Sequence, residues 1–248
     1  MKNRIRILLT LSILVLLTSA CFPRLVRTTP DSESQTPISE GQDLAAFTEI
    51  DIEAAGPVFL IQGNTHSIQI EGPKRAVEDI TFEVRNGVLI IKHSNNIWDW
   101  ITARDYPTIT ITFNDLTRFI LQGGTELVAD DLDTESLTMQ LEGGASVKMS
   151  NLNVTDLVFD VEGGMDINID GVAETQTLRF AGGTSYDAEN LKSADVKLKI
   201  EGAVTATIWA TELLDLNLSG AYDVKYYGNP SVTQSVQGVG NVESLGEK

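Results

Sequence analysis

Apolar and polar residues alternate in short runs along most of the chain after residue 47. An alternation of period two is typical of a β-strand that buries one face. The clearest runs are Leu137-x-Met139-x-Leu141, Leu157-x-Phe159-x-Val161, Leu178-x-Phe180, Val196-x-Leu198-x-Ile200 and Leu214-x-Leu216-x-Leu218. A glycine follows each run, and a second, shorter alternation such as Val147-x-Met149 comes after it. The pattern predicts a unit of strand, glycine corner, strand and polar turn, with very little helix.

This unit is repeated along the chain. The leading glycines stand at positions 123, 143, 163, 182, 202 and 220, so their spacings are 20, 20, 19, 20 and 18 residues. Two short strands cannot bury their inner face alone, whereas copies stacked in register form continuous internal rows of Leu, Val, Ile and Phe. We therefore predict an all-β, single-domain parallel β-helix, or solenoid, with roughly 20-residue coils over residues 47–248.

An antiparallel sandwich or barrel is the alternative fold for short strands at equal spacing. Such a fold would join its strands by two-residue Asn-Gly or Asp-Gly turns, and Asp170-Gly171 is the one clear example among the repeats. The parallel arrangement is therefore favoured. Residues 47–93 are expected to form the N-terminal cap and first coils, with Asn86-Gly87 as a hairpin turn.

The start of the chain has the pattern of an export signal. Lys2, Arg4 and Arg6 precede an apolar stretch over residues 7–17, which is too short for a confident membrane-spanning helix. The segment Leu17-Thr18-Ser19-Ala20-Cys21 resembles the lipobox of bacterial lipoproteins, in which the cysteine is acylated after cleavage. An ordinary signal peptide with an incidental Cys21 is the alternative.

These features divide the chain into a lipoprotein signal peptide (1–20), a flexible tether (21–46) and the β domain (47–248). The tether is expected because Pro, Ser and Thr are frequent there and apolar periodicity is almost missing. Lipid on Cys21 makes the membrane a predicted partner. We expect an exported protein of the cell envelope that faces the periplasm or the cell exterior.

Charge and composition exclude several classes of function. The chain has 35 acidic and 18 basic residues, a formal net charge of −17, so it lacks the basic surface that nucleic-acid binding needs. Cys21 is the lone cysteine, and His66 and His93 are the two histidines, so we expect neither a metal site nor a cofactor. No arrangement of Ser, His and Asp suggests nucleophilic catalysis.

Two groups of residues are candidates for function. Trp98, Trp100 and Tyr106 interrupt the strand pattern, and exposed aromatic side chains on a loop suit a glycan or protein ligand; the same side chains could instead cover the first coil. The aspartates Asp156, Asp160 and Asp166 recur along the repeats and suggest a carbohydrate-active hydrolase, which would need paired carboxylates, or a lyase, which would need a basic residue beside the substrate acid. They are better explained as solvated surface residues.

The repeats resemble those of a bacterial family of auto-transporter adhesin head domains called the GIN domain. The likeness rests on Phe47-Thr-Glu-Ile-Asp-Ile followed by a Gly-Pro pair, on the Gly-Gly repeats with Asp-Leu or Asn-Leu turns, and on Tyr227-Gly-Asn-Pro with Gly238-Val-Gly240. The resemblance implies a right-handed β-helix and a role in adhesion, with no catalytic residues to carry over. We therefore predict a surface module for binding, adhesion or structure, and no enzyme.

Overall fold

The computed structural model describes residues 37–94 and 106–248 of this chain. The description concerns the unit Ser32–Lys248. Its strands are β1 (Pro37–Asp43), β2 (Glu49–Glu53), β3 (Gly56–Gln62), β4 (Ser67–Pro73), β5 (Ile80–Arg85), β6 (Val88–His93), β7 (Thr108–Phe113), β8 (Arg118–Asp130), β9 (Asp133–Tyr227) and β10 (Ser231–Gly246). One short helix, α1 (Lys74–Glu78), follows β4.

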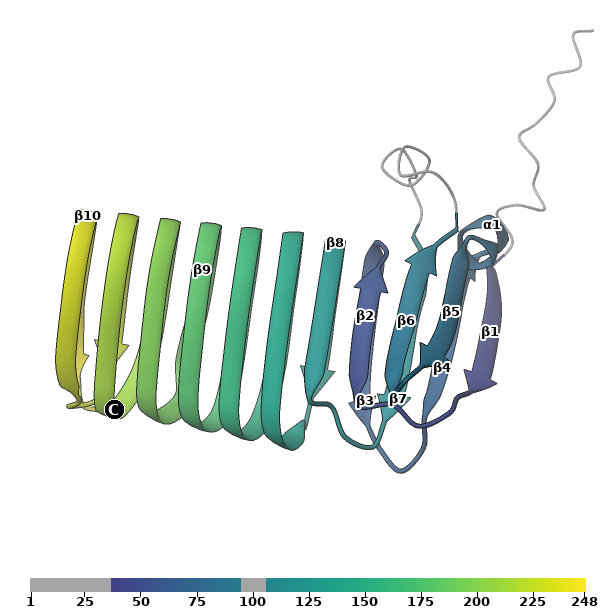
Figure 1. Ribbon diagram of the computed structural model, residues 1–248, viewed down its shortest axis with the longest axis horizontal. Helices are drawn as coiled ribbons and strands as arrows, with labels where there is room; N and C mark the ends of the chain where they lie inside the picture. The colour runs from purple at the N-terminus through teal and green to yellow at the C-terminus, as the bar shows by residue number, and fades with distance from the viewer. Residues whose placement is uncertain (1–36, 95–105) are drawn as a thin grey trace, which may run out of the picture. The chain divides into compact units, whose positions relative to one another are not determined.

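The strands form one curled sheet of mixed orientation (Figure 1). β4 runs antiparallel to both β1 and β7, and β5 runs antiparallel to β6, while the other pairings are parallel. The prediction of a single parallel, right-handed β-helix over residues 47–248 is therefore wrong, whereas its all-β part is confirmed. The non-repeating N-terminal strands cause the difference: the short turn at Asn86-Gly87 makes β5 and β6 antiparallel, and β4 runs antiparallel to two strands distant in sequence.

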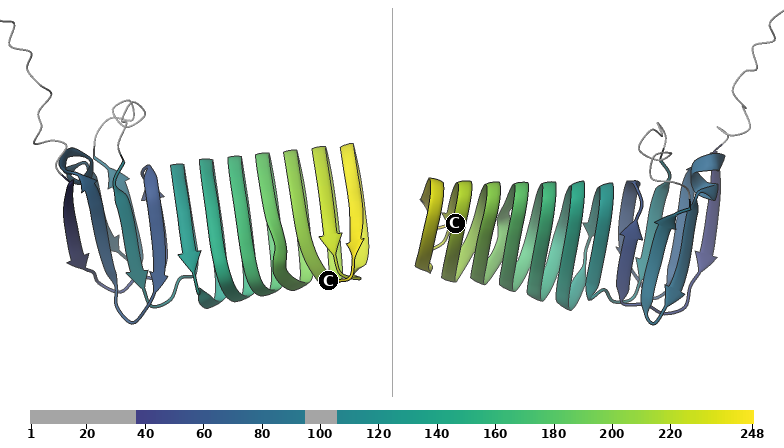
Figure 2. Two further views of the ribbon diagram at one scale, coloured as in Figure 1. Left: turned by 180° about the vertical axis from the view of Figure 1, so that it is seen from behind. Right: turned by 45° about the horizontal axis from the view of Figure 1, so that its top comes forward.

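From β8 onwards the strands pair in parallel and in register. Arg118 pairs with Thr138 and Asp130 with Ser150, an offset of 20 residues that matches the glycine spacing. β10 pairs in the same way with the end of β9, from Ser231 opposite Leu213. Figure 2 shows these strands side by side from two further directions.

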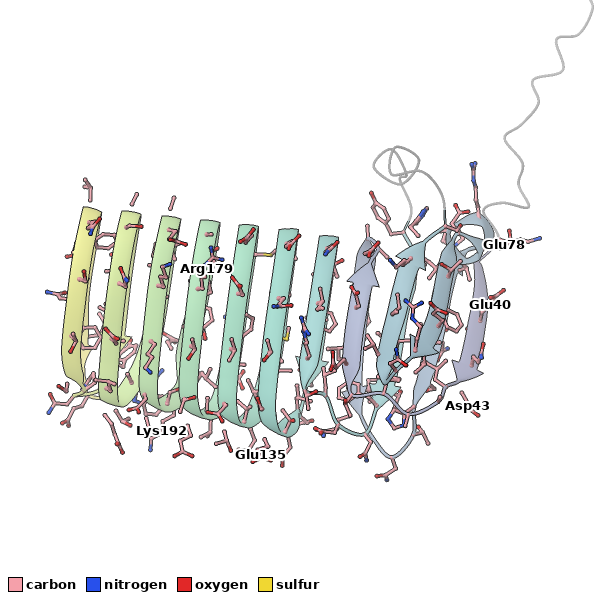
Figure 3. The ribbon with its side chains drawn as sticks, viewed as in Figure 1. Glu40, Asp43, Glu78, Glu135, Arg179 and Lys192 are labelled. Carbon is pink, nitrogen blue, oxygen red and sulfur yellow. The ribbon has the colours of Figure 1, made fainter. Side chains whose placement is uncertain are left out.

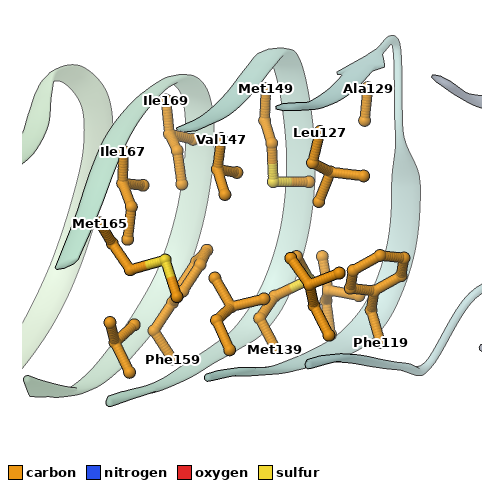
Figure 4. Packing of buried hydrophobic residues seen from close by; sticks show 14 of the residues in the cluster. Phe119, Leu127, Ala129, Met139, Val147, Met149, Phe159, Met165, Ile167 and Ile169 are labelled. Carbon is orange, nitrogen blue, oxygen red and sulfur yellow. The ribbon is translucent and has the colours of Figure 1, made fainter. Parts of the chain in front are cut away.

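The core consists of the inward rows of these strands. Phe119, Met139 and Phe159 occupy one row at 0% exposure, and Leu127 and Val147 belong to a facing row (Figure 4). In residues 37–94 and 106–248, the buried apolar residues all lie between Phe47 and Val224. The unit Ser32–Lys248 thus buries its own core.

The glycine corners are fixed by close contact between neighbouring repeats. A Cβ atom on Gly143, which has a φ of +110°, would collide with the carbonyl oxygen of Gly123. Only glycine fits there, because it tolerates both the left-handed backbone and the close approach. The second glycine differs: a Cβ on Gly144 would lie 3.7 Å from the oxygen of Gly164, an ordinary contact.

The sheet begins earlier than the sequence predicts. Pro37–Asp43, which falls in the stretch predicted as tether, forms β1 and pairs with β4. Ser39 Oγ donates a hydrogen bond to Glu71 at 3.3 Å, and the backbone N–H of Leu44 donates to the carbonyl of His66. In the described residues, no helix is both long and apolar enough to cross a membrane.

Candidate functional site

An apolar patch interrupts the polar outer surface where β3 lies between β7 and β8. Phe59 and Ile61 point outward from β3 and are 37% and 48% exposed, while Leu60 between them is buried. Phe59 pairs with Thr110 of β7 on one side and with Val128 of β8 on the other. The term β3 patch is used for the four side chains of Phe59, Ile61, Thr110 and Val128. It arises because residues 57–61 are apolar on both faces of the strand.

A depression of about 390 Å³ lies over the β3 patch, lined by Phe59, Leu60, Ile61, Gln62, Thr110, Val128, Asp130 and Asp131. Its rim is held by Gln62, whose Nε2 donates to the carbonyls of Asn114 at 3.0 Å and Asp133 at 2.8 Å. Gln62 Oε1 accepts from the backbone N–H of Asp133 at 2.8 Å. These hydrogen bonds within the protein make the rim preformed.

Two carboxylates complete the rim on the side of β8. Asp130 and Asp131 are both exposed, and Asp131 adopts the left-handed conformation with a φ of +56°. Asn151 Nδ2 donates to one oxygen of Asp131 at 2.9 Å, which orients that carboxylate. Carboxylates accept hydrogen bonds, so the depression combines an apolar floor with acceptors on one edge.

The predicted aromatic group is only partly within the described residues. Trp98 and Trp100 lie outside them, as does Cys21. Tyr106 is 38% exposed, and Tyr106 and Pro107 pack against Gly56, where an added Cβ would lie 2.9 Å from that of Tyr106. Tyr106 stands two residues before the start of β7, the strand that contributes Thr110 to the β3 patch.

The aspartates proposed for an enzyme are engaged separately. Asp160 accepts a hydrogen bond from Arg179 at 2.8 Å, and Asp156 accepts one from Thr175 at 2.8 Å. Asp166 lines another depression, of about 520 Å³, together with Tyr222 and other residues. The three carboxylates do not form one site.

Arg179 is the centre of a charged cluster on the outer surface (Figure 3). Its guanidinium lies 2.8 Å from Asp160, 3.1 Å from Glu162 and 3.2 Å from Glu201. Hydrogen bonds to Asp160, then to Glu162, raise the pKa of Arg179 above its ordinary value. The hydrogen bond from Lys199 lowers the pKa of Glu201. The cluster pairs three carboxylates with the two cations Arg179 and Lys199, which fits a structural role.

Neither histidine belongs to a metal site in the described part of the chain. The ring of His66 packs edge-on against that of Phe47, with centroids 5.0 Å apart. Residues 37–94 and 106–248 hold no group of three or more His, Cys, Asp or Glu side chains that could bind an ion.

Comparison with known proteins places the chain in a family. The family model described as "Putative auto-transporter adhesin, head GIN domain" matches residues 46–230. The chain belongs to this family. Among curated proteins, no significant match is found for this GIN domain.

Solved structures share its fold. A "putative adhesin" from Bacteroides fragilis NCTC 9343 is 24% identical, with a TM-score of 0.77 over 86% of this chain and 99% of that one. A "putative lipid binding protein" from Parabacteroides distasonis ATCC 8503 is 15% identical, with a TM-score of 0.66 over 84% and 96%. A "putative adhesin" from the same organism is 17% identical, with a TM-score of 0.66 over 86% and 98%.

The sequence reasoning missed Phe59 and Ile61. Their signal was present, because Val58-Phe59-Leu60-Ile61 is a continuous apolar run where a strand with one solvated face would alternate. Such a run is also typical of a strand buried on both faces, and only the fold shows that one face of β3 is exposed.

Proposed function

We propose that this GIN domain is a non-catalytic binding module of the cell envelope that holds a neutral sugar at the β3 patch. The observation that carries the proposal is the depression over Phe59 and Ile61, with Asp130 and Asp131 on its rim. The apolar face of a sugar ring packs against an aromatic side chain, and its hydroxyls donate to carboxylates. A chain of net charge −17 disfavours acidic sugars.

The size of the site favours a sugar over a protein. Binding sites for small molecules have volumes of roughly 300–1,000 Å³, and this depression of about 390 Å³ falls in that range. A stable protein interface buries about 800 Å² on each partner, far more than two exposed apolar side chains provide. The family's description as an adhesin head agrees with a role in binding at the cell surface.

Attachment to the membrane is part of the proposal. Lipid on Cys21 would hold the domain at the envelope, facing the periplasm or the cell exterior, and the support for it is the lipobox-like segment before this cysteine. Trp98 and Trp100 precede the strand that lines the patch, so we include them as candidate ligand contacts beside Tyr106.

The test is a glycan array probed with the unit Ser32–Lys248, followed by titration of the sugars that bind. Phe59→Ala should weaken binding of a neutral glycan by about tenfold or more, since tenfold corresponds to about 1.4 kcal/mol. Val172→Ala is the matched control, because Val172 is 52% exposed and lies outside the patch. Unchanged affinity in Phe59→Ala, or an array without any bound sugar, would contradict the proposal.

A further inference from the structure

The last strand leaves one edge of the sheet open. β10 pairs along one side with β9, and in the described residues no strand pairs with its other side. In Figure 1 it is the yellow strand at one end of the row. A strand edge of this kind presents a row of unpaired N–H and C=O groups.

The inner row of β10 is uncovered as well. Val232 and Val236 stand opposite Leu214 and Leu218 of the preceding repeat. The two leucines are 0% exposed, whereas Val232 is 39% and Val236 is 44% exposed. The apolar core therefore reaches the open edge at these two valines, while the polar Gln234 between them stands opposite Leu216 and is exposed as well.

Lys248, two residues after β10, contacts residues of earlier repeats. Lys248 Nζ donates to the carbonyl of Glu189 at 2.6 Å and to Asn190 Oδ1 at 2.7 Å, and it lies over the rings of Trp209 and Tyr227. These contacts direct the segment back along the earlier repeats. The opposite end of the sheet differs, because α1 buries Val77 there and β1 pairs beside β4.

The composition of β10 lacks the features that protect an exposed edge. Natural edge strands carry Lys, Pro or inward charges that prevent pairing with another chain. Among the 16 residues of β10, Glu243 is the one charged residue, and there is no proline. A chain of net charge −17 repels its copies over most of its surface, so a nearly neutral strand is the place where two copies approach at least cost.

We propose that β10 is the pairing edge for a second copy of this chain, independently of the sugar site. Two identical strands related by a twofold axis pair antiparallel, and each contributes the same residues to both sides of the interface. The free backbone groups of the two β10 strands bond to each other. Val232 and Val236 of each copy become buried against the partner, which continues the core across the interface.

Sedimentation equilibrium of Ser32–Lys248 tests the pairing. The wild-type unit should form dimers, and Val236→Lys should weaken dimerisation by about tenfold or more, because a lysine ammonium would be buried without a partner. Val172→Lys is the matched control, because it introduces the same charge at a valine that is 52% exposed and lies in β9, outside the pairing edge. Its dimerisation should stay within about twofold of wild type.

Hydrogen exchange of the β10 amides gives a second readout. Protection that rises with protein concentration in the wild type and is lost in Val236→Lys supports self-pairing. A wild type that remains monomeric up to about 100 µM overturns the proposal. A wild-type dimer that Val236→Lys leaves intact also overturns the proposal. A monomer whose β10 amides become protected only with a foreign protein would also overturn it and assign the edge to a foreign strand.

Discussion

The hydroxyl of Tyr186 donates a hydrogen bond of 2.6 Å to Oε1 of Gln176 inside the core, where each residue is 1% exposed. Gln176 Nε2 in turn donates to Ser193 Oγ at 2.6 Å, so the amide is bonded at both ends. Burial raises the pKa of the Tyr186 phenol well above its usual range, which keeps the hydroxyl protonated as a donor. This small polar network replaces apolar side chains in an otherwise hydrophobic core.

Tyr186→Phe should therefore destabilise the domain. The ring keeps its packing against Phe159 and Phe180, but Gln176 Oε1 is left without a partner in the core. An unsatisfied buried acceptor costs about 1–3 kcal/mol in the free energy of unfolding. Urea denaturation measures this loss. The double change Gln176→Leu with Tyr186→Phe should recover part of it, and a single variant as stable as the wild type would show that the bond contributes nothing.

The two glycines of one corner should differ strongly in their sensitivity to alanine. Gly143→Ala places a methyl group against the carbonyl of Gly123 and forces alanine to a φ of +110°, so we expect a loss of about 3 kcal/mol or more in unfolding free energy. Gly144→Ala meets its nearest atom at 3.7 Å, and its effect should stay within about 0.5 kcal/mol. Chemical denaturation compares the two, and equal losses would contradict the role of close stacking.

The raised pKa of Asp51 predicts that the free energy of unfolding depends on pH. Desolvation, followed by the charge of Glu53, raises its pKa above 3.8, while Lys92 and Arg118 act in the opposite direction. Its Oδ1 is buried and has no hydrogen-bond partner in the structure. Since the folded state favours the protonated carboxyl, the stability from Asp51 is fully present below pH 3.8 and is lost as the pH rises through the raised value.

Asp51→Asn removes this titration without changing the size of the side chain. Its unfolding free energy relative to the wild type should rise between pH 3.8 and the raised pKa of Asp51, then level off at neutral pH. Urea titrations at a series of pH values measure the difference, with Glu83→Gln as a control on an exposed carboxylate of β5. A pH-independent difference between wild type and Asp51→Asn would rule out this cause.

The repeats could be predicted from the sequence because their physics is local. Alternation places Leu141 and Val161 inside, and the glycine spacing reproduces the observed register of Gly123 with Gly143. The orientation of β4 could not be predicted, because it depends on the distant strands β1 and β7, whereas the predicted turn at Asn86-Gly87 does join β5 to β6 as an antiparallel pair. β1 was hidden by a composition rich in Pro and Ser, which is typical of a linker.

The candidate site was less accessible to sequence reasoning. Aromatic side chains drew attention to Trp98, Trp100 and Tyr106, whereas the β3 patch depends on a strand whose outer face stays uncovered. A run such as Val58-Phe59-Leu60-Ile61 has the same pattern whether a neighbouring layer covers it or not. The family resemblance, by contrast, is confirmed over residues 46–230.

Arg179→Met should lower the melting temperature in a manner that depends on salt. The change leaves Asp160, Glu162 and Glu201 close together without their shared cation, and only Lys199 still contacts Glu201. Because these groups are partly exposed, added salt screens their repulsion, so the difference from wild type should shrink from low to high ionic strength. Thermal unfolding in a series of salt concentrations measures this difference in melting temperature.

Lys225→Met is the matched control, since Lys225 makes one ion pair of 3.8 Å, with Asp223, and should show a smaller loss at every salt concentration. Equal losses in the two variants would mean that the network around Arg179 adds nothing beyond a single surface ion pair.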